Sequence, residues 1–414
     1  MQNTVKQYKA ILAKRNALSH AMGVLSYDSE TAMPKNGAPH MAETMAILSE
    51  ESYKLQVNDE VRALLEKLNA NSESLDEITR REVEEELKQL KKLENVPIEE
   101  YAAYSRLISE ASVKWREAKQ TNDYQLFKPY LERIIAAQRS LMAHMYPGKD
   151  TYDALLEEFS EGLSVEMLDP FFANVKAKLV PVIHAVCQSG NQADDSLLHR
   201  PFPIEGQRRL SSFVMDLLGI DRDSCVIGEV EHPFTTEFNK HDVRLTTHYH
   251  EDDVLSNMFS VAHEGGHCLY ELNMGDELIG SPLSGGATMT LHESQSRLFE
   301  NMICRSREFI ALLYPKMKEI FPEQMQGVSE EMLYRAANKS MPSLIRTEAD
   351  ELTYPLHIMV RYEIEKKLIA GTLSVDELPA EWNRLYKEYL GVDVPDDTHG
   401  VLQDSHWSGG MIGY

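Results

Sequence analysis

Two histidines four residues apart form the clearest chemical pattern in this sequence. His263 and His267 flank Glu264 in the segment HEGGH, and a helix would place both imidazoles on one face, where they can hold one metal ion. Glu264 is rotated by about 100° from its neighbour on such a helix, so its carboxylate can reach a bound water without being a ligand. The H-E-x-x-H spacing is typical of zinc peptidases. The alternative is a partly buried helix that carries two unrelated histidines.

Two further features favour a metal site. Gly265 and Gly266 each cost roughly 1 kcal/mol relative to alanine inside a helix, a cost that is explained if another backbone or a substrate packs there. Glu293 follows far enough downstream for a second helix to return and offer a third ligand. Two neutral imidazoles and one carboxylate leave an open coordination position, as in catalytic zinc sites. The expected chemistry is water activation, in which the metal lowers the pKa of the water and polarises a carbonyl while Glu264 transfers the proton to the leaving amine.

The elements that must position these residues are mostly helices. Apolar residues recur every three or four positions over residues 1–220, and one clear helix is expected at residues 76–95, whose acidic run we interpret as a solvated face. Residues 226–250 are rich in Thr, Val, Phe and Tyr, which predicts two or three short strands in an antiparallel ribbon that turns at residues 239–242. Helical patterning then returns and continues to Leu390. The expected fold is mainly α with a small antiparallel β element.

Composition excludes several classes of function. The 414 residues carry a formal net charge of −24, which argues against binding nucleic acid or an anionic membrane, because both require clustered Lys and Arg. No stretch approaches the roughly 20 apolar residues of a membrane span. The four cysteines are too widely spaced in sequence for a CxxC pair and too few to crosslink so long a chain, so a reducing, cytoplasmic location is expected.

Six segments together resemble the carboxypeptidase Taq family of metallocarboxypeptidases. They match its blocks in order and spacing over most of the chain, and the N-terminal segment YDSETAMP fits as well. The six blocks are His232-Pro233-Phe234, Asp242 to Thr246, His263 to His267, His292 to Gln295, Ile345 to Asp350 and Gly400 to Trp407.

The resemblance implies a multi-helix metallopeptidase fold with a deep cleft, shared in outline with angiotensin-converting enzyme and neurolysin-like peptidases. It implies removal of single C-terminal residues from peptides with broad specificity, one zinc or cobalt ion per chain, and a homodimer. We expect one peptidase domain over residues 1–414, with a helical half at 1–220 and a metal-bearing half at 221–414.

The resemblance also assigns roles to individual residues. His263, His267 and Glu293 take the positions of the metal ligands, and Glu264 that of the general base. His406 and Tyr414 look like the His and Tyr pair that stabilises the oxyanion in the converting-enzyme relatives.

A guanidinium group is the side-chain group best suited to bind a substrate's C-terminal carboxylate. Arg346 and Arg244 are the candidates, each with the alternative of a structural pair with Asp350 or Asp242. His232 and Gln403, from the same blocks, complete the candidate substrate-binding residues.

The chain ends at Tyr414, whereas the family members that it resembles continue for several tens of residues. A truncated C-terminus is therefore expected. Two other functions stay open: an oligoendopeptidase of the neurolysin type, in which the arginines do not hold a substrate terminus, and an inactive truncated remnant that retains only binding.

Overall fold

The fold is described by a computed structural model of residues 1–230, 232–285 and 288–414, without the side chains of residues 35, 38 and 42. The chain divides into two compact units, each assembled from two separate stretches: unit 1 comprises residues 1–94 and 195–337, and unit 2 comprises residues 95–194 and 338–414. The single peptidase domain with halves meeting at residue 220 stays a prediction. Among the described residues, no helix combines the length and the apolar character needed to cross a membrane.

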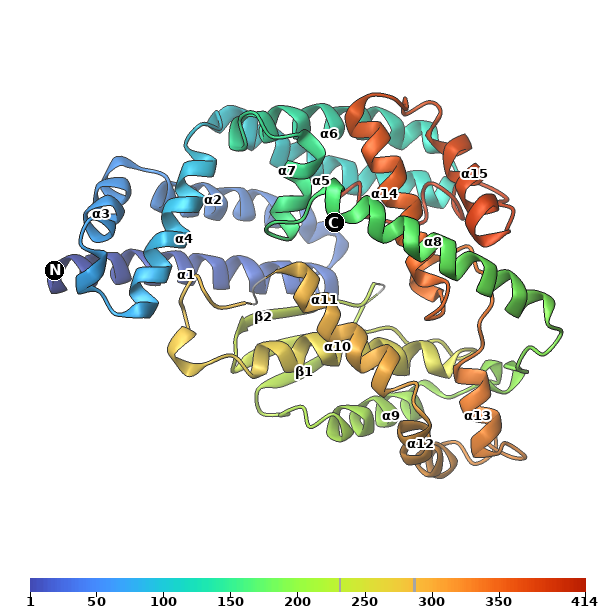
Figure 1. The fold of residues 1–414 in the computed structure, drawn as a ribbon. Helices are drawn as coiled ribbons and strands as arrows, with labels where there is room; N and C mark the ends of the chain where they lie inside the picture. The colour runs from blue at the N-terminus through green and yellow to red at the C-terminus, as the bar shows by residue number, and fades with distance from the viewer. Residues whose placement is uncertain (231, 286–287) are drawn as a thin grey trace. The chain divides into compact units, whose positions relative to one another are not determined.

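Unit 1 holds nine α-helices and three strands within its described residues (Figure 1). Its elements are α1 (Gln2–Thr31), α2 (Ala38–Gln56), α3 (Asp59–Asn69), α4 (Glu77–Leu93), α9 (Ile204–Leu217), β1 (Cys225–Glu229), β2 (Thr235–Asn239), β3 (Asp242–Thr247), α10 (Val254–Leu272), α11 (Met289–Arg297), the π-helix η5 (Leu298–Ile303), α12 (Arg307–Ile320) and α13 (Glu330–Ala337).

The helix expected at residues 76–95 is confirmed as α4, which begins because the side chain of Asp76 accepts a hydrogen bond from the backbone N–H of Thr79. Its acidic run is only partly solvated, so the interpretation of the whole run as an exposed face was wrong. Glu82 and Glu86 are buried, and they form ion pairs with Lys9 and Arg15 of α1. These cations compensate the cost of burying the two carboxylates.

The β element contains three strands in the order β1-β3-β2. The predicted hairpin is confirmed, since β2 and β3 are antiparallel and turn between Asn239 and Asp242. The antiparallel expectation was wrong for β1, which pairs with β3 in parallel, with Cys225 opposite Val243. A parallel partner requires a crossover, and the connection that contains β2 provides it. Helix α10 packs against strands β2 and β3 of this sheet.

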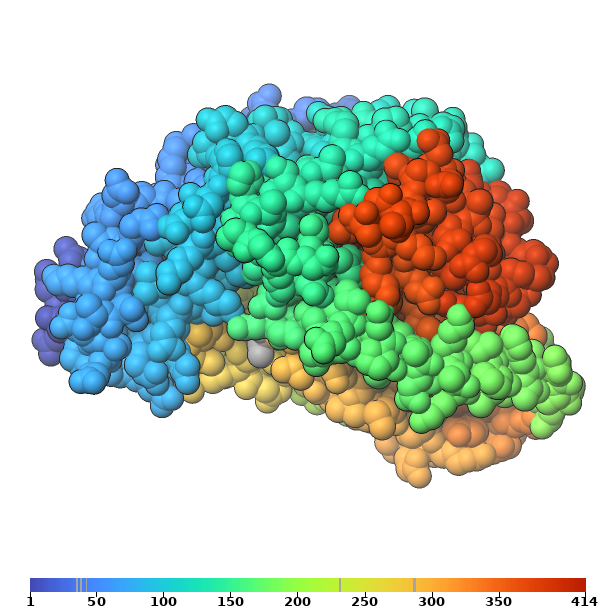
Figure 2. Space-filling model, turned by 45° about the horizontal axis from the view of Figure 1, so that its top comes forward, coloured from blue at the N-terminus to red at the C-terminus, as the bar shows by residue number. Residues whose placement is uncertain are grey.

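Unit 2 consists of helices alone within its described residues. Its helices are α5 (Ile98–Thr121), α6 (Tyr124–Met145), α7 (Thr151–Phe159), α8 (Val165–Gln188), α14 (Tyr354–Ala370) and α15 (Leu378–Leu390). The two stretches of unit 2 share one hydrophobic core. In Figure 2 the green helix α8 lies against the red part of the chain that contains α14 and α15. The chain after α15 runs through turns to Tyr414. The mainly α fold is thus confirmed.

Candidate metal centre

Helix α10 carries the HEGGH segment, and its sequence explains how it is held. Asp253 caps it, because its side chain accepts a hydrogen bond from the N–H of Ser256 at 3.1 Å. Its apolar side, which includes Met258 and Val261, is fully buried in the core of unit 1. The helix packs against α9, α11 and strand β3, so the histidines stand on a helix with little freedom to move.

Glycine allows α11 to approach α10 closely. A Cβ atom added at Gly266 would lie 2.7 Å from Cα of Ser296 and 2.9 Å from the carbonyl oxygen of Gln295, whereas one at Gly265 would meet the side-chain tips of Leu218 and Ile220. The expectation that another backbone packs on this face is confirmed at Gly266. Ser296 belongs to the same helix as Glu293, so this contact sets the distance of Glu293 from the two histidines.

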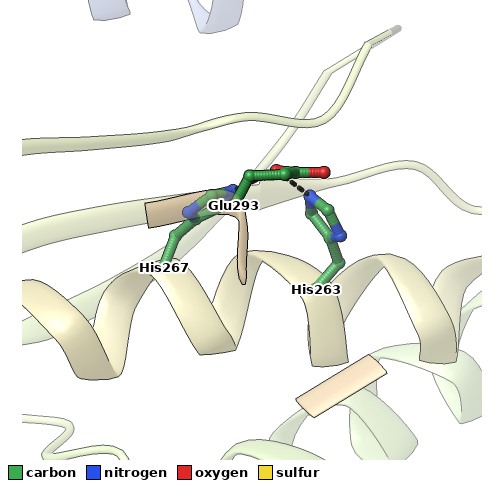
Figure 3. Close-up of side chains that lie close together, drawn as sticks. All are labelled: His263, His267 and Glu293. Atoms are coloured by element: carbon green, nitrogen blue, oxygen red, sulfur yellow. Dashed lines mark ion pairs between the residues drawn. The ribbon is translucent and has the colours of Figure 1, made fainter. Parts of the chain in front are cut away.

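The three expected ligands converge in unit 1. One ligand atom from each of His263, His267 and Glu293 lies within 4.8 Å of the other two. The Oε2 atom of Glu293 is 3.6 Å from Nε2 of His263 and 3.3 Å from Nε2 of His267. Figure 3 shows both imidazoles rising from α10 toward the carboxylate. Two imidazole nitrogens and a carboxylate oxygen suit a divalent transition metal, so the donor set fits the metal that the sequence predicts.

The Nδ1 atom of each of these two imidazoles contacts another polar side chain. Nδ1 of His263 is 2.8 Å from Oε2 of Glu300, a buried carboxylate on the π-helix that follows α11. Nδ1 of His267 contacts Nδ1 of His292, whose Nε2 lies 2.7 Å from the buried carboxylate of Glu271. Such contacts fix the ring orientation and tautomer of metal-binding histidines.

Charges around the site favour ionised Glu293. Burial raises the pKa of this carboxyl, but the contact with His267 and the charges of His263 and Arg297 outweigh it and hold the pKa well below its usual range. Burial lowers the pKa of His263, while the hydrogen bond to Glu300 and the neighbouring carboxylates raise it more, so the net direction is upward. Arg297 bridges Glu293 at 3.1 Å and Glu300 at 2.7 Å.

Glu264 lies on α10 between the two histidines and is buried. The hydroxyl of Thr235, on β2, donates a hydrogen bond of 2.6 Å to its Oε2 atom. The carboxylate is therefore held by a donor from the sheet. Thr235 was not predicted from the sequence.

The remaining candidates in unit 1 lie elsewhere on it. Arg244, on β3, forms a two-point ion pair with Asp242, with distances of 2.9 and 3.0 Å. Its guanidinium also lies over the ring of Phe238, 4.6 Å from the centroid. This is the structural pair considered as the alternative for Arg244. His232 is exposed in the segment before β2.

Unit 2 holds the other candidates in one cluster. Nε of Arg346 is 2.6 Å from Oδ2 of Asp404, and Nδ1 of His406 is paired with the other oxygen of Asp404. The ring of Tyr414 stacks on that of His406, with centroids 5.2 Å apart. Burial and the charge of Arg361 lower the pKa of His406 to about 4.

The amide of Gln403 is used within its own unit. Its oxygen accepts a hydrogen bond from the N–H of Arg346, and its nitrogen donates to the carbonyl of Leu344 and the hydroxyl of Tyr386. Gln403 thus fixes the backbone at Arg346.

Sequence reasoning missed Glu300, Glu271, Arg297 and Thr235. Helical spacing carried a signal for three of them: Glu300 follows Glu293 by two helical turns, Arg297 follows Glu293 by one turn of α11, and Glu271 follows His267 by one turn of α10. Thr235 lies on β2, and only the fold brings it to the site.

Comparisons with known proteins agree with this geometry. The family model described as carboxypeptidase Taq (M32) metallopeptidase matches residues 7–414. Carboxypeptidase 1 of Bacillus subtilis is 40% identical over 409 residues, which cover 99% of this chain and 82% of that protein. Thermostable carboxypeptidase 1 of Thermus thermophilus is 34% identical over 413 residues, covering 97% of this chain and 81% of that protein.

Solved structures give the same result. The crystal structure of the M32 carboxypeptidase from Deinococcus radiodurans matches with a TM-score of 0.94 and 33% identity, covering 99% of this chain and 82% of that one. The chain is therefore a metallocarboxypeptidase, a hydrolase of peptide bonds for which a divalent metal is expected. It belongs to the carboxypeptidase Taq (M32) family of metallopeptidases.

Proposed function

We propose that this chain releases single C-terminal amino acids from peptides, with broad specificity, using one zinc ion held by His263, His267 and Glu293; cobalt is the second choice of metal. The observation that carries the proposal is the convergence of these three ligand atoms within 4.8 Å. The contacts at the Nδ1 atoms support it, because they leave both Nε2 atoms directed at Glu293. When bound, zinc would acidify a water molecule and polarise the scissile carbonyl.

Glu264 is the general base of this proposal. Its carboxylate accepts the proton of the attacking water and passes it to the leaving amine. The hydrogen bond from Thr235 supports this role, because it holds one carboxylate oxygen and leaves the other for the proton. Burial of Glu264 keeps competing solvent away from that proton.

His406 and Tyr414 are the proposed donors to the oxyanion. Asp404 and Nη1 of Arg361 both contact Nδ1 of His406, which restricts the orientation of the ring. Stacking on His406 and an edge contact with Phe159 at 5.3 Å restrict the ring of Tyr414. Donors held before the reaction stabilise developing charge more than mobile ones do.

Arg346 and Arg244 are the proposed partners of the substrate carboxylate, with His232 as a further substrate-binding residue. We propose that Gln403 contributes indirectly, because its amide holds the backbone of Arg346. Among the described residues all four cysteines are free thiols, which supports a cytoplasmic location. The homodimer and the deep cleft implied by the resemblance remain predictions.

An oligoendopeptidase is the second candidate, because both arginines already face carboxylates of their own chain. The deciding experiment incubates the zinc-loaded protein with a peptide and with the same peptide amidated at its C-terminus, and follows the products by mass spectrometry. A ladder of single-residue losses from the free peptide alone is expected. Internal cuts in both peptides would favour the oligoendopeptidase, and no cleavage by fully loaded protein would favour the inactive remnant.

A further inference from the structure

Two buried thiols lie in contact, and one of them is on the metal-bearing helix α10. Cys225 begins strand β1, and Cys268 follows the predicted ligand His267 on α10. Their Sγ atoms are 3.1 Å apart. The two residues are 2% and 0% exposed, respectively. Both are free thiols.

The fold brings together two cysteines that are 43 residues apart in sequence. Strand β1 pairs in parallel with β3, and β3 packs against α10. Cys225 lies opposite Val243 in this pairing, and both belong to the same hydrophobic core as Cys268. The contact is thus made within the buried core of unit 1 and needs no exposed loop.

We propose that Cys225 and Cys268 are an oxidative modification site and form an internal disulfide when the protein meets hydrogen peroxide. In the first step one thiol sulfur attacks a peroxide oxygen, the O–O bond breaks, and a sulfenic acid and one water form. In the second step the other sulfur attacks the sulfenic sulfur, the S–O bond breaks, and the hydroxyl leaves with the second thiol proton as water. Two sulfurs are oxidised by one electron each and one peroxide is reduced to two waters.

Proximity and burial select this outcome. A disulfide bond is about 2.05 Å long, so the two sulfurs must approach by only about 1 Å. The neighbouring thiol intercepts a sulfenic acid before further oxidation, because no diffusion is needed. Peroxide is small enough to enter a packed core during its fluctuations, whereas a bulky disulfide reagent is not. Burial makes the first step slow, so Cys187, which is exposed, reacts earlier.

The crosslink would join β1 to α10 immediately beside His267. The enclosed loop contains β2, β3 and the part of α10 that carries His263 and Glu264. A disulfide that closes such a loop restricts the unfolded chain and stabilises the fold. Oxidised protein should therefore unfold at a higher urea concentration than reduced protein. This inference does not depend on the peptidase activity.

The test treats the full, zinc-loaded chain with hydrogen peroxide, denatures it in iodoacetamide and maps the peptides by mass spectrometry. The expected product is a linked pair of peptides containing Cys225 and Cys268, lighter than the sum of the two reduced peptides by two hydrogen atoms. Finding both cysteines separately alkylated, or separately oxidised to sulfinic acid, at a dose that fully oxidises Cys187 would overturn the proposal.

Matched variants sharpen the result. Cys268→Ala should abolish both the linked peptide and the rise in urea midpoint, and dithiothreitol should reverse that rise in the parent protein. Cys304→Ala removes an equally buried thiol and should leave both unchanged. A peroxide-induced rise in midpoint that persists in Cys268→Ala would contradict the assignment, and the peptide map of the parent protein decides the question even if a variant fails to fold.

Discussion

The buried carboxylate of Glu271 accepts a hydrogen bond from Nε2 of His292 at 2.7 Å. A carboxylate can only accept, so this contact places the proton of His292 on Nε2 and leaves Nδ1 as an acceptor. Nδ1–H of His267 can then donate to it. The lone pair of His267 is thereby kept on Nε2, on the side of Glu293. Glu271 thus sets the tautomer of His267, a proposed metal ligand, through His292 and without contacting His267 itself.

Removing Glu271 or His292 should weaken metal binding. We expect Glu271→Ala and His292→Ala each to raise the zinc dissociation constant about 10–100-fold, because the tautomer of His267 is no longer fixed. Competition with a chromophoric chelator measures this constant. Glu277→Ala, which removes an exposed carboxylate from the following loop, is the control. Unchanged affinity in both variants would show that this pair does not set the tautomer.

Adding one methyl group between α10 and α11 should also disturb the site. Gly266→Ala places a Cβ against the backbone of Ser296, which cannot yield without moving α11 and with it Glu293. We expect about a tenfold or greater loss of zinc affinity and a lower unfolding temperature, measured by chelator competition and calorimetry.

Gly265→Ala is the matched control for this prediction, because its Cβ would meet only the ends of the Leu218 and Ile220 side chains. Its zinc affinity should stay close to that of the parent. Equal losses in the two variants would mean that helix distortion matters and the spacing between α10 and α11 does not.

Glu264→Gln should retain zinc and lose turnover. The amide preserves the shape of the side chain but cannot accept the water's proton, so a loss of about 10³-fold in kcat is expected at equal metal occupancy. Thr235→Val, which removes the donor to Oε2, should have a smaller effect. Parent-like turnover in zinc-loaded Glu264→Gln would remove this residue from the mechanism.

The metal-site motif was readable from sequence because a helix converts spacing directly into direction. The helical repeat alone was enough to predict that His263 and His267 share a face with Glu264 between them. To predict Glu293, it was enough to expect a second helix that returns beside the first. The parallel pairing of β1 was not readable, because alternation of polar and apolar residues predicts a strand without predicting its partner.

Contacts between elements that are far apart in the chain could not be predicted from the sequence either. Leu291, Leu298 and Met302 recur at helical spacing along α11 and the π-helix that follows it, yet these side chains are 52%, 37% and 70% exposed. Periodicity therefore located the helix without showing its buried side. The same limit explains why the acidic run of α4 concealed two buried carboxylates, whose partners lie on α1.

The substrate carboxylate should be bound by Arg346 in preference to Arg244. Arg244 is held by a two-point charged pair with Asp242, whereas Nη1 of Arg346 contacts the neutral hydroxyl of Tyr354, which a carboxylate can displace. Arg346→Met should cost about 2–4 kcal/mol in kcat/KM on free peptides. Arg244→Met is the comparison variant. If neither variant discriminates free from amidated peptides, the oligoendopeptidase becomes the better description.

The stability of unit 2 should fall in mild acid because of His357. This residue is buried, and burial together with the charge of Arg346 lowers its pKa to about 3. In the unfolded chain its pKa is about 6.5. Between these values the unfolded state binds a proton that the folded state does not, so stability decreases as the pH falls from about 6.5 toward 3. One such proton contributes about 1.4 kcal/mol per pH unit.

Tryptophan fluorescence can isolate this effect, because Trp115, Trp382 and Trp407 all belong to unit 2. Urea unfolding of His357→Gln, followed by this signal between about pH 6.5 and 4.5, should show a pH slope shallower by the contribution of one proton. Some slope should remain, because the pKa of His406 is also lowered, to about 4. His184→Gln removes an exposed histidine and should leave the slope unchanged. An unaltered slope in His357→Gln would mean that this imidazole takes up its proton equally in the folded and unfolded states.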